Sequence, residues 1–461
     1  HKFSNMIDSA RITLDFKQKF IGLAILALCV FFAVDSGVIF FIGINIIINI
    51  FYLATTLYKF CLVFIGFVQK KEIDVSRYEI EQLSDETLPV YTILLPVFKE
   101  TEIIPQLILS IAQLDYPKNK LDVNLLVEET DVQMHQLLGK INLPEYFNIV
   151  IVPDSQPRTK PKACNIGLGY AKGEYLVIYD AEDIPDPDQL KKSVCAFRKV
   201  DDSRVICLQA KLNYYNPKQN MLTKWFACEY CMWFDLYLPG LDALEAPIPL
   251  GGTSNHFKTT YLKKLGGWDA YNVAEDCELG IRIFREGFRT RIFNSTTWEE
   301  ANSRFINWLK QRSRWIKGYI QTWCVHMRKP VDLARKMGLV NFCSFQLTVG
   351  GLFITLLFTP IYWLIALGYF IAGNNLFPNL FISSTYLITY VLLLSNVIFI
   401  LLNMMACLKR SYRYLLPEAL ISPIYWILIS IGAWRGFLQL FTRPHFWEKT
   451  KHGLFVSKKN Q

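Results

Sequence analysis

Charge is scarce in this sequence. Only 19% of its 461 residues are Asp, Glu, Lys or Arg, whereas 52% are hydrophobic and come in long blocks. This composition argues against a wholly soluble protein, and the length leaves room for a membrane portion beside one domain. The net charge of +9 is spread around the blocks and motifs and is not gathered in one basic tract. It favours anionic lipid and an anionic substrate as partners, and no nucleic acid is expected.

A regular cysteine framework is also lacking. The eleven cysteines suit a reducing compartment and exclude a disulfide-stapled fold. Cys228 and Cys231 have the spacing of a metal-binding pair, but no second pair stands near them. Their aromatic-rich surroundings predict a helix buried at the membrane interface, so we expect no zinc site. No small-residue cleavage site follows the apolar residues 20–34, which excludes a cleaved signal peptide.

Four membrane spans are expected. Crossing the hydrocarbon takes about 20 apolar residues. Three blocks meet that length, namely 37–58, 341–371 and 379–408. Residues 20–34 are shorter and reach the length of a span only when flanking residues are included. The apolar stretch 415–441 is interrupted by two prolines and contains Arg435, so we expect a helix that lies in the membrane interface.

The placement of Lys and Arg predicts the orientation of these spans. Residues 1–19 are rich in Lys and Arg, whereas the loops at 35–36 and 372–378 carry neither. Because basic residues stay on the cytosolic side, both termini and the central domain are expected in the cytosol. The expected units are 1–68 with two spans, a cytosolic domain at 69–340, two spans at 341–408, and an interface helix and tail at 409–461.

Strands and helices alternate at the start of the central domain. Apolar runs predict strands at 90–95, 124–127, 148–152 and 175–179, with helices near 103–114 and 163–171. This alternation predicts an α/β domain with a mostly parallel sheet, and we find no internal repeat. Ligands bind beyond the carboxyl ends of such strands. Three polar segments follow strands in this way: 96–100, 128–131 and 180–183.

The segment Asp180-Ala181-Glu182-Asp183 directly follows a predicted strand. Carboxylates two residues apart on an extended turn point the same way and supply the oxygen ligands that Mg²⁺ or Mn²⁺ needs. A solvated acidic turn that caps a helix is the alternative. The position after a hydrophobic strand favours the metal site.

Two further segments carry acidic or aromatic groups on predicted helices. Glu275 and Asp276 lie at a helix start, where the helix dipole favours an ionised general base, although an acidic capping box explains them as well. Gln311, Arg314 and Trp315 share one helix face by their spacing. That face suits a sugar ring and phosphate oxygens, and a membrane-facing aromatic stripe is the alternative.

Two loops have weaker signals. The segment 160–165 places basic and amide groups before a helix. This arrangement could contact a phosphate, and a basic loop exposed to solvent is the alternative. The turn that begins Gly251-Gly252-Thr253 lets a backbone approach a ligand, but an ordinary loop has the same pattern.

In this order, the motifs resemble the inverting, processive family-two glycosyltransferases of the cellulose-synthase type, in their bacterial exopolysaccharide-synthase branch. The resemblance covers about 95–455, and residues 311–315 match the QxxRW pattern at every fixed position. Residues 162–165 are similar to K-A-G-N and 274–276 to T-E-D, each with one exchange. Residues 180–182 depart from D-x-D, because Glu is the second carboxylate.

The resemblance implies a GT-A-type α/β cytosolic domain inserted between transmembrane helices. Asp276 would be the base, and Asp180 with Glu182 or Asp183 would hold Mg²⁺ or Mn²⁺. The UDP part of a UDP-sugar donor would contact Pro96, Glu100, Glu128, Glu129, Lys162, Asn165, Arg314, Thr450 and His452. The donor and acceptor sugars would contact Glu275, Gln311, Trp315, Gly252 and Thr253.

The tail 447–453 is similar to the gating loop of that family, and we expect it to act as a lid. The resemblance further implies that the protein polymerises the sugar into an exopolysaccharide and moves the growing polysaccharide across the bacterial inner membrane. The partners that it implies are a cyclic-dinucleotide-sensing domain and an outer-membrane export protein. The chain opens with His1, so we expect a piece to precede it.

Two alternatives stay open at this point. The chain could transfer one sugar to a polyprenyl phosphate and stop, or it could be a non-catalytic membrane receptor or transporter. The QxxRW pattern and the tail favour polymerisation over the first. Intact candidates for the base and the metal ligands favour an enzyme over the second.

Overall fold

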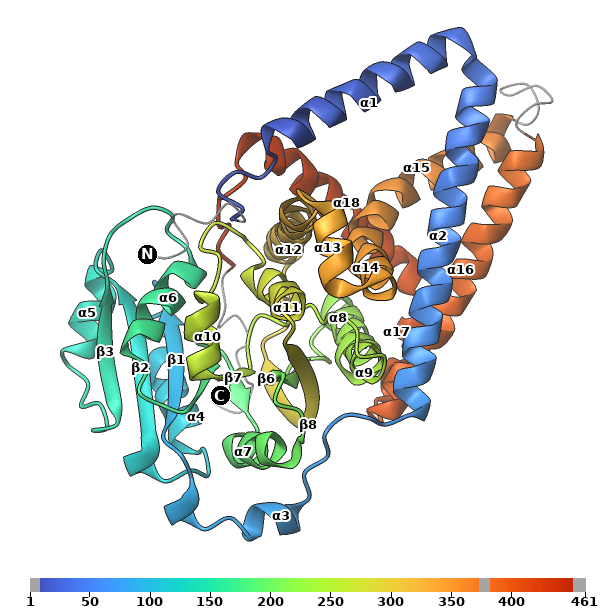
Figure 1. Ribbon diagram of the computed structural model, residues 1–461. Coiled ribbons are helices and arrows are strands. Elements are labelled where there is room, and N and C mark those ends of the chain that lie inside the picture. The colour runs from blue at the N-terminus through green and yellow to red at the C-terminus, as the bar shows by residue number, and fades with distance from the viewer. Residues whose placement is uncertain (1–8, 373–381, 451–461) are drawn as a thin grey trace.

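The computed structural model describes residues 9–372 and 382–450, and within them the strands form one eight-stranded sheet (Figure 1). The strand order is β3-β2-β1-β4-β7-β6-β8-β5. Strands β1 to β4 are parallel, β7 runs antiparallel between β4 and β6, and β6 pairs parallel with β8. Their bounds are β1 Tyr91–Val97, β2 Leu121–Glu128, β3 Phe147–Val152, β4 Tyr175–Ile178, β5 Ile184–Pro185, β6 Val205–Tyr214, β7 Asn255–Lys258 and β8 Arg289–Glu299. The predicted α/β class is confirmed, but the sheet is mixed where we predicted a mostly parallel one, because β7 and β5 pair antiparallel with their neighbours.

Strand β1 runs two residues past its predicted end at Leu95. Proline lacks an N–H, so it interrupts a ladder on the side to which that N–H would point. The carbonyl of Leu94 accepts from Tyr179 N–H just beyond β4, which places the N–H side of Pro96 toward a strand that has already ended. Pro96 therefore stays in the ladder with β2, opposite Leu126.

Helices cover both faces of the sheet. Successive side chains along each strand point to opposite faces, so each strand contributes to two cores. Ile93 and Leu95 face a core shared with α4 (Ile104–Ala112), α5 (Val132–Leu138) and α7 (Gln189–Lys199). Leu94 faces the other core, shared with α6 (Lys160–Tyr170), α10 (Thr259–Leu265) and α11 (Glu275–Arg285). The short helix α3 (Arg77–Glu81) joins the domain to the helical part.

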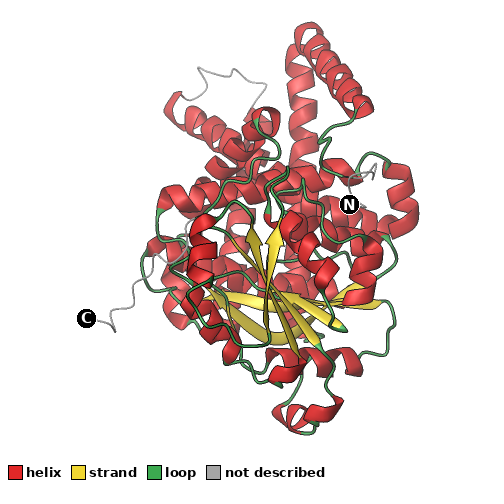
Figure 2. Ribbon diagram, turned by 90° about the vertical axis from the view of Figure 1, so that its left-hand side faces the viewer, coloured by secondary structure: helices red, strands yellow, loops and turns green. Residues whose placement is uncertain are grey.

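The remaining helices gather on one side of the sheet, as Figures 1 and 2 show. They are α1 Phe16–Asp35, α2 Gly37–Val68, α8 Met221–Met232, α9 Leu238–Ala243, α12 Phe305–His326, α13 Pro330–Met337, α14 Leu339–Phe345, α15 Gly351–Ala372, α16 Ile382–Lys409, α17 Leu416–Leu420 and α18 Ser422–Thr442. A π-helical turn, Trp233–Tyr237, connects α8 to α9. A third core joins α2, α8, α9, α12, α16, α17 and α18.

Four helices in the described residues are long and apolar enough to cross a membrane: Phe16–Asp35, Ile42–Val68, Leu339–Leu364 and Ser422–Thr442. The first three coincide with predicted spans. The predicted span 379–408 lies partly outside the described residues, which include its apolar end Leu393–Lys409. Helix α18 has the length of a span, although we predicted an interface helix there. The predicted outer loop 372–378 is, from 373 on, outside the described residues.

Helices α2 and α9 cross at two glycines. A Cβ at Gly66 would lie 2.1 Å from the carbonyl oxygen of Leu236, and one at Gly240 would lie 2.1 Å from that of Leu62. No side-chain carbon fits at these distances, so each position requires glycine. Helix α2, the second of the four membrane-type helices, is thereby joined backbone to backbone to α9 and the π-helical turn before it.

Candidate active site

Two cavities meet at the carboxyl end of β4. The larger, of about 290 Å³, extends from this point between the long helices, and the smaller, of about 190 Å³, lies over the ends of β1 and β2. The residues that line both are Lys160, Asp180, Glu182, Arg314, Trp447 and Thr450. Most of these residues belong to the segments that the sequence predicted to carry the chemistry.

The smaller cavity contains the first two polar segments, as their positions after parallel strands predicted. Pro96, Glu100 and Glu128 line it. Lys162 Nζ lies 3.1 Å from Glu128 Oε2, although Lys162 itself lines neither cavity. Burial raises the pKa of Glu128, and Lys162 opposes the rise. Glu129 is exposed and accepts from Asp154 N–H at 3.1 Å, so it lies at the rim.

The acidic turn after β4 divides into two parts. Asp180 and Glu182 line both cavities, and Lys160 forms an ion pair with Asp180. Asp183 turns inward, where its Oδ2 contacts the Thr253 hydroxyl and accepts from Asp180 N–H at 2.7 Å. Burial and the charges of Asp180 and Glu182 raise the pKa of Asp183 well above its usual range.

Two residues that were predicted to contact the ligands lie behind the cavities. Asp183 and Thr253 are 2% and 0% exposed, and neither lines a cavity, so they brace the turn from behind. Of the two candidates for the second metal ligand, Glu182 lines both cavities and Asp183 lines neither. No group of three His, Cys, Asp or Glu side chains in the described ranges could by itself hold a metal ion.

Asp276 lies in the first turn of α11, at the wall of the larger cavity. Its Oδ1 accepts from Cys277 N–H at 2.8 Å, while its Oδ2 lies 3.3 Å from where a Cβ on Gly252 would be. The glycine turn and the predicted base, far apart in sequence, thus lie side by side.

The acidic pair at the start of α11 is buried. Burial raises the pKa of Asp276, and the Cys277 N–H, Lys160 and Arg314 oppose the rise. Burial and the charge of Asp276 raise the pKa of Glu275 to about 8. The hydrogen bond from Cys277 N–H to Asp276 favours the ionised form of this carboxylate, which is the state that a general base needs.

One face of α12 lines the larger cavity, as predicted, with Gln311, Arg314 and Trp315. Gln311 Oε1 accepts from Asn302 at 2.8 Å, and Arg314 donates to the carbonyl of Val273, just before the acidic pair, at 3.4 Å. The face is polar and aromatic at once, and it is turned toward the cavity. This arrangement favours a binding face over a lipid-facing stripe.

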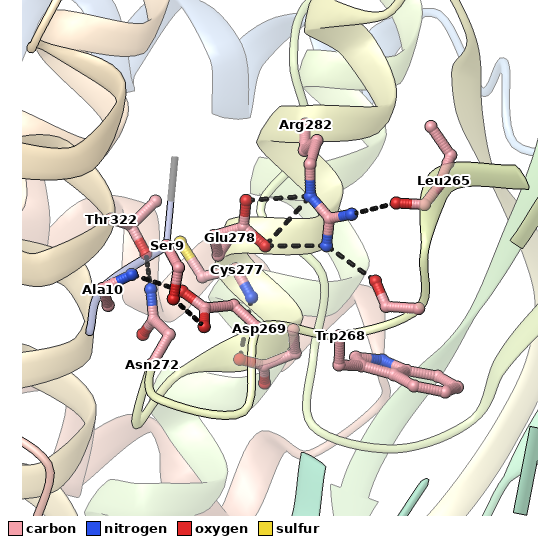
Figure 3. Close-up of polar contacts among 12 residues, drawn as sticks. Ser9, Ala10, Leu265, Trp268, Asp269, Asn272, Cys277, Glu278, Arg282 and Thr322 are labelled. Atoms are coloured by element: carbon pink, nitrogen blue, oxygen red, sulfur yellow. Dashed lines mark hydrogen bonds and ion pairs between the residues drawn. The ribbon is translucent and has the colours of Figure 1, made fainter. Parts of the chain in front are cut away.

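A polar network behind the cavity holds α11 in place (Figure 3). Asp269 accepts from the Ser9 hydroxyl at 2.8 Å and from Ala10 N–H at 2.6 Å. Arg282 pairs with Glu278 and donates to the carbonyls of Leu265 and Gly267. The base therefore sits on a helix that is fixed on the side away from the cavity.

Asn165 belongs to this support and not to the cavity lining. Its amide donates to the carbonyl of Trp268 at 2.7 Å and accepts from Trp268 N–H at 2.8 Å. Both polar ends of the side chain are thus engaged by one residue. Neither cavity includes Asn165, so the structure places this predicted UDP contact behind the site.

The tail reaches back over both cavities. Trp447 places its ring 4.3 Å from the Arg314 guanidinium carbon, and Lys449 Nζ lies 3.1 Å from Glu100 Oε1. Thr450 is 5% exposed and lines both cavities. His452 lies outside the described residues. Residues 447–450 thus lie over the place where the sequence predicted the nucleotide.

Three residues of the site were not singled out from the sequence. Lys160 pairs with Asp180 and donates to the Gly252 carbonyl at 2.8 Å, and Glu299, which ends β8, lines the larger cavity. Arg312 is joined to Glu229 and to the Tyr425 hydroxyl, deeper in that cavity. Lys160 lies in the basic segment 160–165. The positions of Glu299 and Arg312 in the site depend on how β8 and α8 pack, which no local pattern in the sequence indicates.

Comparison with known proteins gives one family match. The family model described as "Glycosyl transferase family group 2" matches residues 175–438. The chain is 25% identical over 234 residues to "Probable glycosyltransferase YdaM" of Bacillus subtilis, covering 50% of this chain and 55% of that protein. It is also 25% identical over 354 residues to "Probable glucomannan 4-beta-mannosyltransferase 10" of Arabidopsis thaliana, covering 73% of this chain and 60% of that one.

Solved structures show distant likeness. A mannosyltransferase, PcManGT from Pyrobaculum calidifontis in complex with GDP-Man and Mn²⁺, aligns over 86% of this chain and 99% of its own, with 16% identity and a TM-score of 0.49. S. aureus TarS 1–349 in complex with UDP-GlcNAc aligns over 79% and 97%, with 13% identity and a TM-score of 0.37.

The matched residues 175–438 run from β4 into α18 and so include the acidic turn, the acidic pair on α11 and the QxxRW face of α12. The match covers more than half of the chain, and the expected GT-A-type α/β fold is confirmed. The chain spans only 55% and 60% of the lengths of the two curated relatives. On this evidence the chain belongs to glycosyl transferase family group 2.

Proposed function

We propose that this protein is an inverting, processive β-glycosyltransferase that polymerises a UDP-activated sugar into an exopolysaccharide and moves the product across the membrane. One observation carries the proposal. The larger cavity runs without a break from Asp180 and Asp276 to residues of the apolar helices α2, α15 and α18. An acceptor chain in this cavity would extend from the reacting end directly into the helical part of the protein.

The chemistry follows from the position of Asp276. Its Oδ1 is held by Cys277 N–H, which leaves Oδ2 for an acceptor hydroxyl beside Gly252. As the acceptor oxygen bonds to the anomeric carbon, the bond from that carbon to the diphosphate oxygen breaks and Oδ2 takes the hydroxyl proton. Attack from the face opposite the departing diphosphate inverts the anomeric carbon and gives a β-linkage.

The smaller cavity suits the nucleotide diphosphate. Lys160, Arg158 and Lys449 bring positive charge to its walls, and Arg314 lies where the two cavities meet. The Asp180 and Glu182 carboxylates are hard oxygen ligands of the kind that Mg²⁺ or Mn²⁺ binds together with substrate phosphates, so two protein ligands suffice. A cation held there would neutralise charge on the departing diphosphate.

The membrane end of the larger cavity suits a carbohydrate chain. Aromatic rings offer flat apolar surfaces to sugar rings, and Trp225, Trp233 and Trp426 line this part of the cavity. Glu229, Lys59 and Asn403 add polar groups among them. This mixture supports an acceptor of several sugar units better than one aliphatic lipid.

The test is an assay of the full chain reconstituted in lipid bilayers. Release of nucleoside diphosphate is measured with a panel of UDP-sugars, with GDP-mannose added because the Arabidopsis relative is named a mannosyltransferase, and the product is sized. Release from a UDP-sugar with a long product supports the proposal. A single sugar added to polyprenyl phosphate would replace polymerisation by monoglycosyl transfer. No release from any donor would overturn an enzymatic role.

A further inference from the structure

The segment Arg443–Phe446, called here the latch segment, binds to α12 through its main chain. Lys317 Nζ donates to the carbonyls of Arg443 and Phe446 at 3.1 and 3.0 Å. Gln321 Nε2 donates to the carbonyl of Pro444 at 3.0 Å. Since Trp447 follows the latch segment directly, these three bonds decide where the tail begins its path over the cavities.

Gln321 uses both ends of its amide. While Nε2 holds Pro444, its Oε1 accepts from Val273 N–H at 3.1 Å. The side chain is 0% exposed, and turning the amide over would set its NH₂ against an N–H and its oxygen against a carbonyl. Gln321 is therefore locked between the latch segment and the loop that precedes Asp276 by three residues.

The loop before the base contacts the latch segment a second time. His445 has one ring nitrogen 3.2 Å from the Tyr271 carbonyl and the other 3.1 Å from the Arg11 carbonyl. The Arg314 guanidinium, which lies over the Trp447 ring, also donates to the Val273 carbonyl. The loop Tyr271–Ala274, called here the base loop, thus shares its polar partners with the tail.

Lys317 strengthens the latch because it is buried among carbonyls. It is 0% exposed, and both of its hydrogen-bond acceptors belong to the latch segment. Burial lowers its pKa to about 8. An ammonium in this position gains hydrogen bonds only while the segment is docked, so removing the tail would leave a buried cation without them.

We propose that Gln321, supported by Lys317, is a positioning residue that couples docking of the tail to placement of Asp276. The amide holds Pro444 and Val273 in one rigid unit, so the base loop takes its working position when the tail is down and loses its inner support when the tail lifts. The inference rests on the proposed function, because it assigns catalysis to Asp276 and closure to the tail.

Two substitutions at one position separate the two bonds. In Gln321→Glu the ionised carboxylate still accepts from Val273 N–H but has no donor for the Pro444 carbonyl, so the bond that it loses directly is the one to the tail. Gln321→Met has similar length and makes neither bond. Gln133→Glu, on the exposed surface of α5, is the control for the added charge.

The first measurement is hydrogen exchange of the peptide that covers 443–450, with and without UDP, on the full chain in lipid nanodiscs. In Gln321→Glu we expect exchange to rise roughly tenfold, the factor for losing one buried hydrogen bond, while Gln133→Glu stays at the wild-type rate. Lys317→Met should raise exchange in the same peptide. Wild-type exchange in both Gln321 variants would overturn the latch.

The second measurement is donor turnover across pH. Because release of the tail also loosens the base loop, Gln321→Glu and Gln321→Met should both lower kcat and shift the acidic limb of the profile in the same direction. An acidic limb at its wild-type position in Gln321→Glu, together with raised exchange of 443–450, would overturn the coupling. A wild-type protein without turnover but with protected 443–450 would refute the proposed function alone, since exchange reads the latch independently of catalysis.

Discussion

Adding one methyl group at Gly252 tests whether the free oxygen of Asp276 is the reacting one. A Cβ at this position would lie 3.3 Å from Asp276 Oδ2, which is closer than most Cβ contacts, so the carboxylate must move by a few tenths of an ångström. The same methyl would fill the space within ~3 Å of Oδ2 that an acceptor hydroxyl must enter for proton transfer. Displacements of ~1 Å in an active site cost about 100-fold in rate.

We therefore expect Gly252→Ala to lower kcat by roughly 10- to 100-fold while donor binding changes little, because the smaller cavity is untouched. The assay measures release of nucleoside diphosphate against donor concentration, with binding of the unreactive nucleotide followed separately. Gly169→Ala is the matched control, since a Cβ there meets nothing within 4 Å. A kcat within twofold of wild type would refute the placement of the acceptor beside Oδ2.

Four further predictions concern the base, the metal, the tail and the orientation. Asp276→Asn should keep UDP binding and lower turnover by about 10²–10⁴, and retained turnover would refute the base. Since burial raises the pKa of Asp276, the wild-type rate should fall on acidification at a higher pH than an ordinary aspartate predicts, which a pH–rate profile checks. Chelation by EDTA should abolish activity and Mg²⁺ or Mn²⁺ should restore it, so full activity after chelation would contradict the metal site. Trp447→Ala and Thr450→Ala keep the charge of the tail, and both should lower turnover with membrane insertion intact; near-normal synthesis would favour a tail that only binds lipid. Labelling from outside should succeed at Asn374→Cys and fail at Lys458→Cys, and labelling at the second would place the C-terminus outside.

Strand positions and motif positions could be predicted because they depend on local pattern. The apolar runs before Pro96, Glu128 and Asp180 form adjacent strands, and so the polar residues after them meet at one edge. The face of α12 followed in the same way from helical spacing. These are short-range consequences of backbone geometry, which sequence alone carries.

The direction of individual side chains could not be predicted in the same way. Asp180 and Asp183 stand three residues apart, yet one faces the cavities and the other faces Thr253, because the turn reverses between them. Glu229 and Arg312 form an ion pair across 83 residues of sequence. Such pairs depend on how α8 and α12 pack, and no spacing rule contains that information.

The glycine crossing of α2 and α9 decides which wall of the larger cavity is able to move. Backbone contact at Gly66 and Gly240 leaves no intervening side chains over which the two helices could slide. Lys59 and Val63 of α2, and the aromatic residues of α8 and its π-helical turn, therefore line the cavity from a single rigid side. Helix α18 is joined to α12 in a similar way, because a Cβ at Gly436 would lie 2.5 Å from the Ser313 carbonyl oxygen. The larger cavity thus has two walls that are set by backbone contact, and widening for a longer occupant would have to come from its other helices.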